Sequence, residues 1–241
     1  MPNRILVLSR GYETPVIGLG EITFNPMDFV NDPKEFSLVV FTGGADVDPR
    51  FYGDTSPKNY CSYSTQRDVF EKGIFDLALK NGILMTGICR GVQFLNVMSG
   101  GTMMHHVDRH AGTDHTVEML NGDRLLVNSY HHQMVIPPEN GIVVGWAEPR
   151  ISDIYIGKND EIVDYGGKEN EIIIFPDTKA FGAQCHPEML PNHHEAFVFY
   201  RHMVETALVS DWNDFIEAYT GENHHDQMVK MGVHNCTSTR R

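Results

Sequence analysis

Residues 81–101 of this 241-residue chain read NGILMTGICRGVQFLNVMSGG, and they indicate a strand followed at once by a helix. The apolar run from Ile83 to Met85 predicts a buried strand, and a helix-like segment follows Gly91. Between them stands G-I-C-R-G, the pattern of a nucleophile elbow with cysteine in place of serine. Gly87 and Gly91 lack a Cβ atom, so a strand and a helix can approach closely on either side of a strained central residue.

Cys89 is that central residue, and the pattern places it at the first turn of the helix. Unpaired backbone N–H groups and the helix dipole favour a thiolate over a thiol at such a point. The alternative is a buried structural cysteine beside ordinary turn glycines. The remainder of the chain has to decide between the two.

The overall composition is that of an ordinary globular protein, with 41% hydrophobic and 21% charged residues. The formal net charge of −13 opposes binding to phosphate backbones, so we expect no nucleic acid and no anionic membrane as partners. The four cysteines lie far apart without a C-x-x-C pair, which favours a reduced, cytoplasmic compartment. We expect no signal peptide, because the N-terminal MPNRILVLSRG has only a short apolar run and no cleavage-site pattern. We also expect no membrane span, since no apolar stretch approaches the ~18 residues that a span requires.

Apolar runs at residues 4–9 and 38–41 predict two further buried strands, and a helix is expected from Thr65 to about Asn81. Thr65 and Asp68 are expected to start that helix, with Phe70, Ile74, Leu77 and Ala78 as its apolar stripe. Short strands are predicted later, at residues 116–120, 124–127, 142–147, 153–156, 162–165, 171–175 and 180–185, followed by a helix at about 193–209. Early alternation of strands and helices with late short strands favours an α/β fold whose parallel sheet carries an antiparallel elaboration. We expect residues 1–220 to form a single domain and the polar tail 221–241 to be partly disordered.

A nucleophilic cysteine requires a base, and the base requires a group that orients it. His186 and Glu188 follow directly after the predicted strand at residues 180–185. Side chains at positions i and i+2 at a strand end point in the same direction, so the carboxylate can fix the imidazole tautomer. Pro187 between them prevents a helix from forming there.

Gly43 and Gly44 follow the predicted strand at 38–41 and offer a second feature of such sites. Glycines at the carboxyl end of a parallel strand allow backbone N–H groups to face a ligand, as in an oxyanion hole. The second N–H group would come from Arg90, the residue after the cysteine. A plain tight turn is the alternative for the two glycines.

The combined motifs resemble class I glutamine amidotransferase-like proteins, and within them the peptidase C26 branch that includes the γ-glutamyl-γ-aminobutyrate hydrolases. The matching segments are TGGADVDPRFYG (42–53), QRDVFE (66–71), GICRGVQFLNVMSGGT (87–102), VNSYHHQMV (127–135) and FGAQCHPEM (181–189). The resemblance extends from about Leu38 to about Met189 and implies a flavodoxin-like three-layer sandwich with a central, mostly parallel sheet.

The resemblance also implies a role for each matching residue. Cys89 would be the nucleophile that forms a γ-glutamyl thioester, His186 the general base and acid, and Glu188 its orienting carboxylate. The backbone N–H groups of Gly44 and Arg90 would stabilise the oxyanion. The residues that would bind the substrate are Gly43, Gln93, Ser129, His131 and His132.

Three functions are compatible with this resemblance. The first is a free-standing hydrolase that cleaves glutamine or a small γ-glutamyl amine. The second is a glutaminase subunit that supplies ammonia to a synthetase or amidoligase partner in trans, and the third is a catalytically silent binding module. The intact Cys89, His186 and Glu188 set opposes the third function. The stretch from Pro149 to Asp177 departs from the family pattern and is a candidate flap or partner surface, and a homodimer is a further option for assembly.

Four histidines, His105, His106, His110 and His115, raise the question of a metal site. Their spacing fits no closed zinc pattern, and the sequence places no acidic or cysteine ligand beside them. We therefore expect no metal and no cofactor. For Arg67 and Asp68, an ion pair at a helix start is favoured over a role in supporting the site.

Overall fold

The structure is a computed structural model that describes residues 3–54 and 59–221. The predicted tail at 221–241 lies outside the described residues from residue 222 onward. The helices are α1 (Pro26–Asn31), α2 (Thr65–Lys80), α3 (Arg90–Met98), α4 (Glu195–Val209) and α5 (Trp212–Thr220). The strands are β1 (Arg4–Val7), β2 (Glu21–Thr23), β3 (Phe36–Phe41), β4 (Leu84–Ile88), β5 (Thr102–Met104), β6 (His106–Val107), β7 (His115–Met119), β8 (Arg124–Val127), β9 (Met134–Ile136), β10 (Ile142–Ala147), β11 (Tyr155–Ile156), β12 (Glu169–Phe175) and β13 (Ala180–Ala183).

Within the described ranges, one sheet of nine strands runs in the order β2-β1-β3-β4-β13-β12-β10-β7-β8. The pairs from β2 to β13 in this order are parallel, and the pairs from β13 to β8 are antiparallel. Strands β5 and β9, and β6 and β11, form two small antiparallel sheets beside it. The predicted α/β class, with a parallel half and an antiparallel elaboration, is confirmed.

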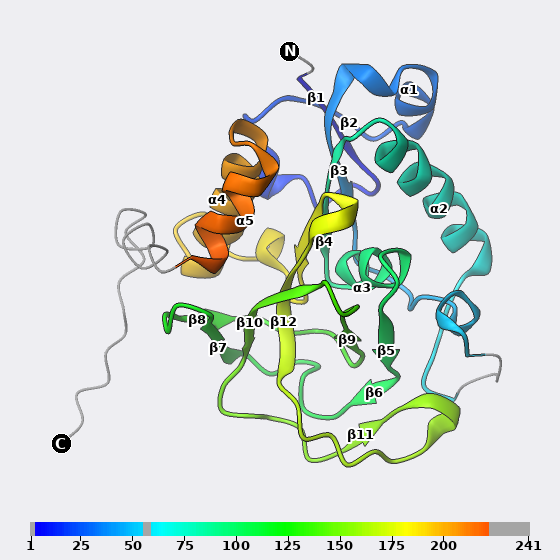
Figure 1. The fold of residues 1–241 in the computed structure, drawn as a ribbon, viewed down its shortest axis with the longest axis vertical. Helices are drawn as coiled ribbons and strands as arrows, with labels where there is room; N and C mark the ends of the chain where they lie inside the picture. Colours follow the sequence, from blue (N-terminus) through cyan, green and yellow to red (C-terminus); the bar gives the residue numbers. More distant parts are fainter. Residues whose placement is uncertain (1–2, 55–58, 222–241) are drawn as a thin grey trace.

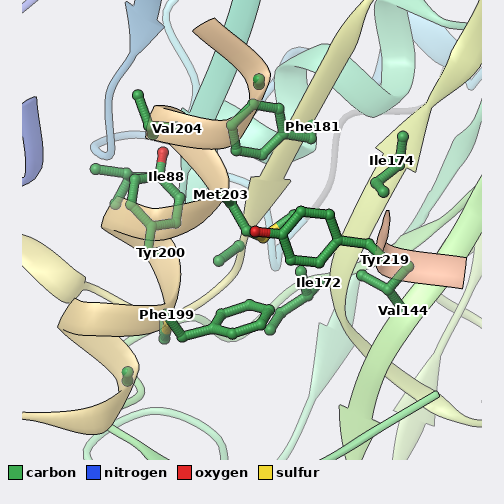
Figure 2. Close-up of a cluster of buried hydrophobic side chains, with 14 of the residues drawn as sticks. Ile88, Val144, Ile172, Ile174, Phe181, Phe199, Tyr200, Met203, Val204 and Tyr219 are labelled. Carbon is green, nitrogen blue, oxygen red and sulfur yellow. The ribbon is translucent and has the colours of Figure 1, made fainter. Parts of the chain in front are cut away.

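Helices cover both faces of the sheet and make the sandwich three layers deep (Figure 1). Successive residues of a strand point to opposite faces, so Val40 contributes to one apolar core and Val39 to the other. Figure 2 shows the first core, where side chains of α4 and α5 such as Tyr200 and Tyr219 pack near Phe181 of the sheet. The second core lies under α2 and α3, and burying both faces leaves the strand ends as the place for a site.

Several elements differ from their predicted form. Ser64, whose side chain accepts a hydrogen bond from the N–H group of Arg67, caps α2 in place of Thr65. Phe70 is 47% exposed, because the buried face of α2 passes through Ile74, Phe75 and Ala78. The predicted strand at 162–165 is wrong: Ile162 forms one isolated bridge to Ile156 and is 81% exposed.

The prediction of a flap or partner surface from Pro149 to Asp177 is also corrected in part. Residues Glu169–Phe175 form β12, which pairs with β10 and β13 inside the sheet and is buried along its whole length. A flap or partner surface is therefore restricted to the residues before β12. The predicted strand begins at Glu171, and the pattern hid the two residues before it because Glu169 and Asn170 are polar.

Among the described residues, no helix combines the length and the apolar character needed to cross a membrane.

Candidate active site

The sharp turn at Cys89 joins β4 to α3, as the G-x-C-x-G pattern predicts. Cys89 has a φ of 52° and a ψ of −114°, a conformation that L-residues rarely adopt. A Cβ atom on Gly91 would lie 2.1 Å from the carbonyl oxygen of Phe41, and one on Gly87 would lie 2.4 Å from the N atom of Val92. Only glycine therefore fits at either side of the turn.

Cys89 is 8% exposed and immediately precedes α3. Its own backbone N–H group donates to the carbonyl of Ala183 at 2.8 Å, which ties the elbow to the end of β13. The register places Gly87 of β4 beside Phe41 of β3 and Gly182 of β13. The segments that follow these three strands consequently emerge at the same edge of the sheet.

His186 and Glu188 lie at this edge, beyond β13. Nδ1 of His186 is 2.6 Å from Oε1 of Glu188, and the side chains are 7% and 2% exposed. Burial by itself lowers the pKa of His186, but the neighbouring Cys89 sulfur and the Glu188 carboxylate outweigh burial and raise that pKa to about 10. The imidazolium form is thus favoured between a sulfur on one side and a carboxylate on the other.

Three residues that hold or surround His186 are absent from the sequence prediction. The side chain of Asn128 accepts a hydrogen bond from the backbone N–H of His186 and donates another to its carbonyl, each at 2.9 Å. The rings of Tyr12 and Tyr130 lie 6.2 Å and 5.6 Å from the imidazole, measured between ring centroids. Asn128 stands in the VNSYHHQMV motif and could have been found there, whereas Tyr12 lies in a segment without a clear pattern.

Gly43 and Gly44 lie next to these groups, after β3. A Cβ atom on Gly43 would lie 3.1 Å from Cε1 of His186, and Gly44 has a φ of +131°, which favours glycine. In the described residues, the backbone N–H groups of Gly44 and Arg90 donate to no protein acceptor. Two such N–H groups, one of them on the residue that follows Cys89, can stabilise a developing oxyanion.

The side chain of Arg90 is fully buried and forms ion pairs with Asp68 and Glu71 of α2. Arg67 donates to Glu71 at 2.7 Å and to the carbonyl oxygens of Thr42 and Gly43 at 3.0 and 3.1 Å. Asp68 also accepts a hydrogen bond from the backbone N–H of Asp48 at 2.9 Å. Together, these contacts connect the helix after the elbow with the glycine loop.

The favoured interpretation of Arg67 and Asp68 as a local ion pair is therefore wrong. Asp68 pairs with Arg90, and Arg67 pairs with Glu71. Asp68 holds the side chain of Arg90, and Arg67 holds the loop at Thr42 and Gly43, so both side chains support the site. The sequence could not reveal this, because the two residues are neighbours in the chain but point to different partners on a helix.

The residues predicted to bind the substrate are placed differently from one another. His132 is partly exposed, with Nε2 3.2 Å from Oδ1 of Asp46. Gln93 is buried and donates to the carbonyl of Gln133 at 3.3 Å, while the buried hydroxyl of Ser129 has no hydrogen-bond partner among the described residues. His131 is buried against Glu171, with 3.2 Å between Nε2 and Oε1, and therefore faces the interior.

Comparisons with known proteins agree with this architecture. Residues 32–123 match the model of the family described as Peptidase C26. The glutamine amidotransferase-like protein YvdE homolog of Lactococcus lactis subsp. cremoris is 32% identical over 134 residues, which cover 46% of this chain and 71% of that protein. Protein NtpR of Enterococcus hirae is 26% identical over 213 residues, which cover 70% of this chain and 83% of NtpR.

Two more distant proteins also match. The carbamoyl phosphate synthase small chain of Buchnera aphidicola subsp. Acyrthosiphon pisum is 24% identical over 155 residues, 64% of this chain and 34% of that protein. The crystal structure of a glutamine amidotransferase from Thermotoga maritima superposes with a TM-score of 0.51 at 19% identity, covering 97% of each chain, and supports the fold. With the family match, the related sequences and the shared fold in agreement, this chain belongs to the class I glutamine amidotransferase-like superfamily, in its peptidase C26 branch.

Proposed function

We propose that this protein cleaves γ-glutamyl amide bonds by forming a γ-glutamyl thioester on Cys89. The observation that carries the proposal is that Glu188 lies 2.6 Å from Nδ1 of His186 and that the sulfur of Cys89 is near enough to raise the pKa of the same imidazole. A nucleophile, a base and an orienting carboxylate in this order are the parts that covalent amide hydrolysis requires.

In the first step, the thiolate of Cys89 attacks the γ-carbonyl carbon, and the carbonyl oxygen becomes an oxyanion. The backbone N–H groups of Gly44 and Arg90 stabilise that charge. The C–N bond then breaks as Nε2 of His186 gives its proton to the departing amine or ammonia. Glu188 holds Nδ1, which keeps Nε2 directed at the reacting atoms.

In the second step, water replaces the amine. Nε2 of His186 takes a proton from the water, whose oxygen attacks the thioester carbon. The C–S bond breaks, glutamate leaves, and Cys89 is regenerated. The pKa of about 10 suits His186 to the first role, because it carries a proton at neutral pH before the amine leaves.

A second candidate is a glutaminase subunit that passes ammonia to a synthetase or amidoligase. The observation that favours it is the similarity to a protein named as the small chain of carbamoyl phosphate synthase. The site chemistry is the same in both candidates, and only the fate of the ammonia differs.

The test is release of glutamate from glutamine and from a panel of γ-glutamyl amines by the purified protein alone. Cys89→Ala should abolish release, whereas the matched variant Cys61→Ala should retain it. Wild-type turnover by Cys89→Ala would refute the nucleophile assignment. Turnover of a γ-glutamyl amine without a partner supports the hydrolase, and turnover of glutamine only when a synthetase is added supports the subunit. A γ-glutamyl adduct on Cys89, detected by mass spectrometry, would exclude a silent binding module.

A further inference from the structure

Three histidines and a glutamate meet inside the protein, in its antiparallel half. His110 lies between β6 and β7, His115 begins β7, His131 lies between β8 and β9, and Glu171 belongs to β12. All four are buried, and each histidine has a nitrogen within 3.2 or 3.3 Å of the same atom, Oε1 of Glu171. The ligand atoms of His110, His115 and Glu171 all lie within 4.8 Å of one another.

The hydrogen bonds of His115 determine which of its nitrogens carries a proton. Nδ1 lies 3.2 Å from the carbonyl oxygen of Thr113, and a carbonyl can only accept, so Nδ1 donates. In the neutral ring, Nε2 then presents a lone pair to Oε1 of Glu171 at 3.2 Å. A lone pair that faces an anionic oxygen is repelled, unless a proton on Nε2 or a metal ion lies between the two atoms.

Each of the two nitrogens of His110 also faces a carboxylate oxygen. Its Nδ1 lies 3.3 Å from Oε1 of Glu171, and its Nε2 lies 3.4 Å from Oε2 of Glu169. Neither nitrogen has the geometry of a hydrogen bond, and Oε2 of Glu171 also has no hydrogen-bond partner among the described residues. A doubly protonated ring would face both carboxylates as a donor, whereas a neutral imidazole donates from one nitrogen only and leaves the other lone pair for a bound cation.

The buried negative charge of this region also favours a bound cation. Glu169 and Glu171 are 0% and 1% exposed, and within the described part of the chain no lysine or arginine forms an ion pair with either. Glu169 accepts hydrogen bonds from the backbone N–H groups of Ile151 and Ser152 at 2.8 and 2.9 Å, so Glu171 is the carboxylate that most requires positive charge, from protonated rings or from a bound ion.

We propose that His110, His115 and Glu171 bind one divalent transition-metal ion of the zinc class. Imidazole and carboxylate are ligands that Zn²⁺ accepts, and bonds of ~2.0–2.1 Å in a tetrahedron place neighbouring ligand atoms ~3.3–3.4 Å apart. The two distances from Oε1 of Glu171, 3.2 and 3.3 Å, agree with that spacing. Oε2 of Glu171 can add a second carboxylate contact.

The surrounding groups have the arrangement that supports metal ligands. A metal-bound histidine usually donates its other N–H to a carboxylate or a carbonyl. The carbonyl of Thr113 has that position for His115, and Oε2 of Glu169 lies 3.4 Å from the outer nitrogen of His110. His131, 3.2 Å from Oε1 of Glu171, orients the carboxylate from outside the site.

The ion would stabilise the strands that position His186. The carbonyl of Glu171 accepts the backbone N–H of Gln184 at 2.8 Å, two residues before His186. His115 pairs in register with Val127, the residue before Asn128, which holds the backbone of His186. A metal at this point connects two strands that position the imidazole, and its role is structural.

The expectation that no acidic ligand lies near these histidines is corrected by this geometry. Glu171 is 56 residues from His115 in the chain, and only the pairing of β7, β10 and β12 brings them together. His105 and His106 take no part in the cluster, since His105 lies 3.4 Å from Asp54 instead.

The experiment measures zinc in full-length Cys89→Ala protein prepared without an affinity tag, so that neither the reactive thiol nor a tag holds metal. We expect about one zinc per chain by mass spectrometry of the metal. Removal of zinc by a chelator should lower the midpoint of thermal unfolding, and adding ZnCl₂ should restore it. His115→Ala and Glu171→Gln should lose the metal, whereas the matched surface variant His193→Ala should retain it.

A ligand exchange separates direct binding from an effect on folding. His115→Cys should still bind Co²⁺ and should gain a thiolate-to-cobalt charge-transfer band that the unchanged site lacks. The proposal is overturned if the folded protein binds no Zn²⁺ or Co²⁺ in titrations and unfolds at the same temperature with and without them. It is also overturned if zinc binds equally to His115→Ala and Glu171→Gln. These readouts are independent of hydrolysis, so they can fail while the proposed activity stands.

Discussion

Replacing Glu188 by glutamine tests whether a charged partner orients His186. The substitution preserves the shape of the side chain and removes the charge that faces Nδ1 at 2.6 Å. Hydrogen bonds to charged groups contribute about 1.5–3 kcal/mol, and a loss of that size in the transition state corresponds to roughly a 10- to 150-fold decrease in kcat/KM. Because Glu188 raises the pKa of His186, we also expect that pKa to fall in the variant.

Two assays follow this change. Glutamate release gives kcat/KM for the preferred substrate, and the rate of Cys89 alkylation by iodoacetamide across pH reports the sulfur without any assumption about the substrate. Glu205→Gln is the matched control, because Glu205 forms an ion pair with Arg201 on the surface at 2.7 Å and is 41% exposed. An unchanged alkylation profile together with unchanged kcat/KM in Glu188→Gln would refute the orienting role.

Three further predictions concern the elbow, the support of His186 and the dependence on pH. Gly91→Ala should destabilise the fold by more than about 3 kcal/mol in urea unfolding, since its Cβ would meet the backbone of Phe41 at 2.1 Å. Gly73→Ala, on α2 with no atom within 4 Å of the added carbon, should instead stabilise by about 0.5–1 kcal/mol. Asn128→Ala should lose about 1–3 kcal/mol of stability and should lower kcat, because two hydrogen bonds of 2.9 Å to the backbone of His186 disappear; an unchanged kcat would contradict its positioning role. The pKa of His186 rises on folding from 6.5 to about 10, so its contribution to stability is complete below pH 6.5 and is lost toward pH 10. The thermal midpoint should therefore fall over that range by more in the wild type than in His186→Gln, and parallel curves would disprove the shift.

Local patterns predicted most of the fold. The strands at 124–127 and 142–147 have the predicted bounds, and Asn81 and Gly82 end α2 as expected. Apolar runs and turn residues act over a few neighbours, so they can be recognised without knowledge of the tertiary structure. The first two residues of β12 were hidden, because Glu169 and Asn170 are polar and are buried by partners that are distant in the chain.

The candidate site also combines features that local sequence patterns predict with contacts that they do not. The G-x-C-x-G elbow and the His-x-Glu turn were predictable, because steric limits and the two-residue repeat of a strand are local properties. The roles of Asn128 and Arg90 were not, since each depends on a partner that another element supplies: His186 for Asn128, and α2 for Arg90.

The sequence by itself thus determined the family, the α/β class with its main strands and helices, and the position of Cys89 on a strained turn. Tertiary structure decided which groups surround that turn and where the buried charges lie. The physical reason is the register of β3, β4 and β13, which brings three strand ends to one edge, and the pairing of β12, which carries Glu171 to the histidines. Strand pairing joins residues that are far apart in the chain, and no local pattern encodes the side-chain contacts that result.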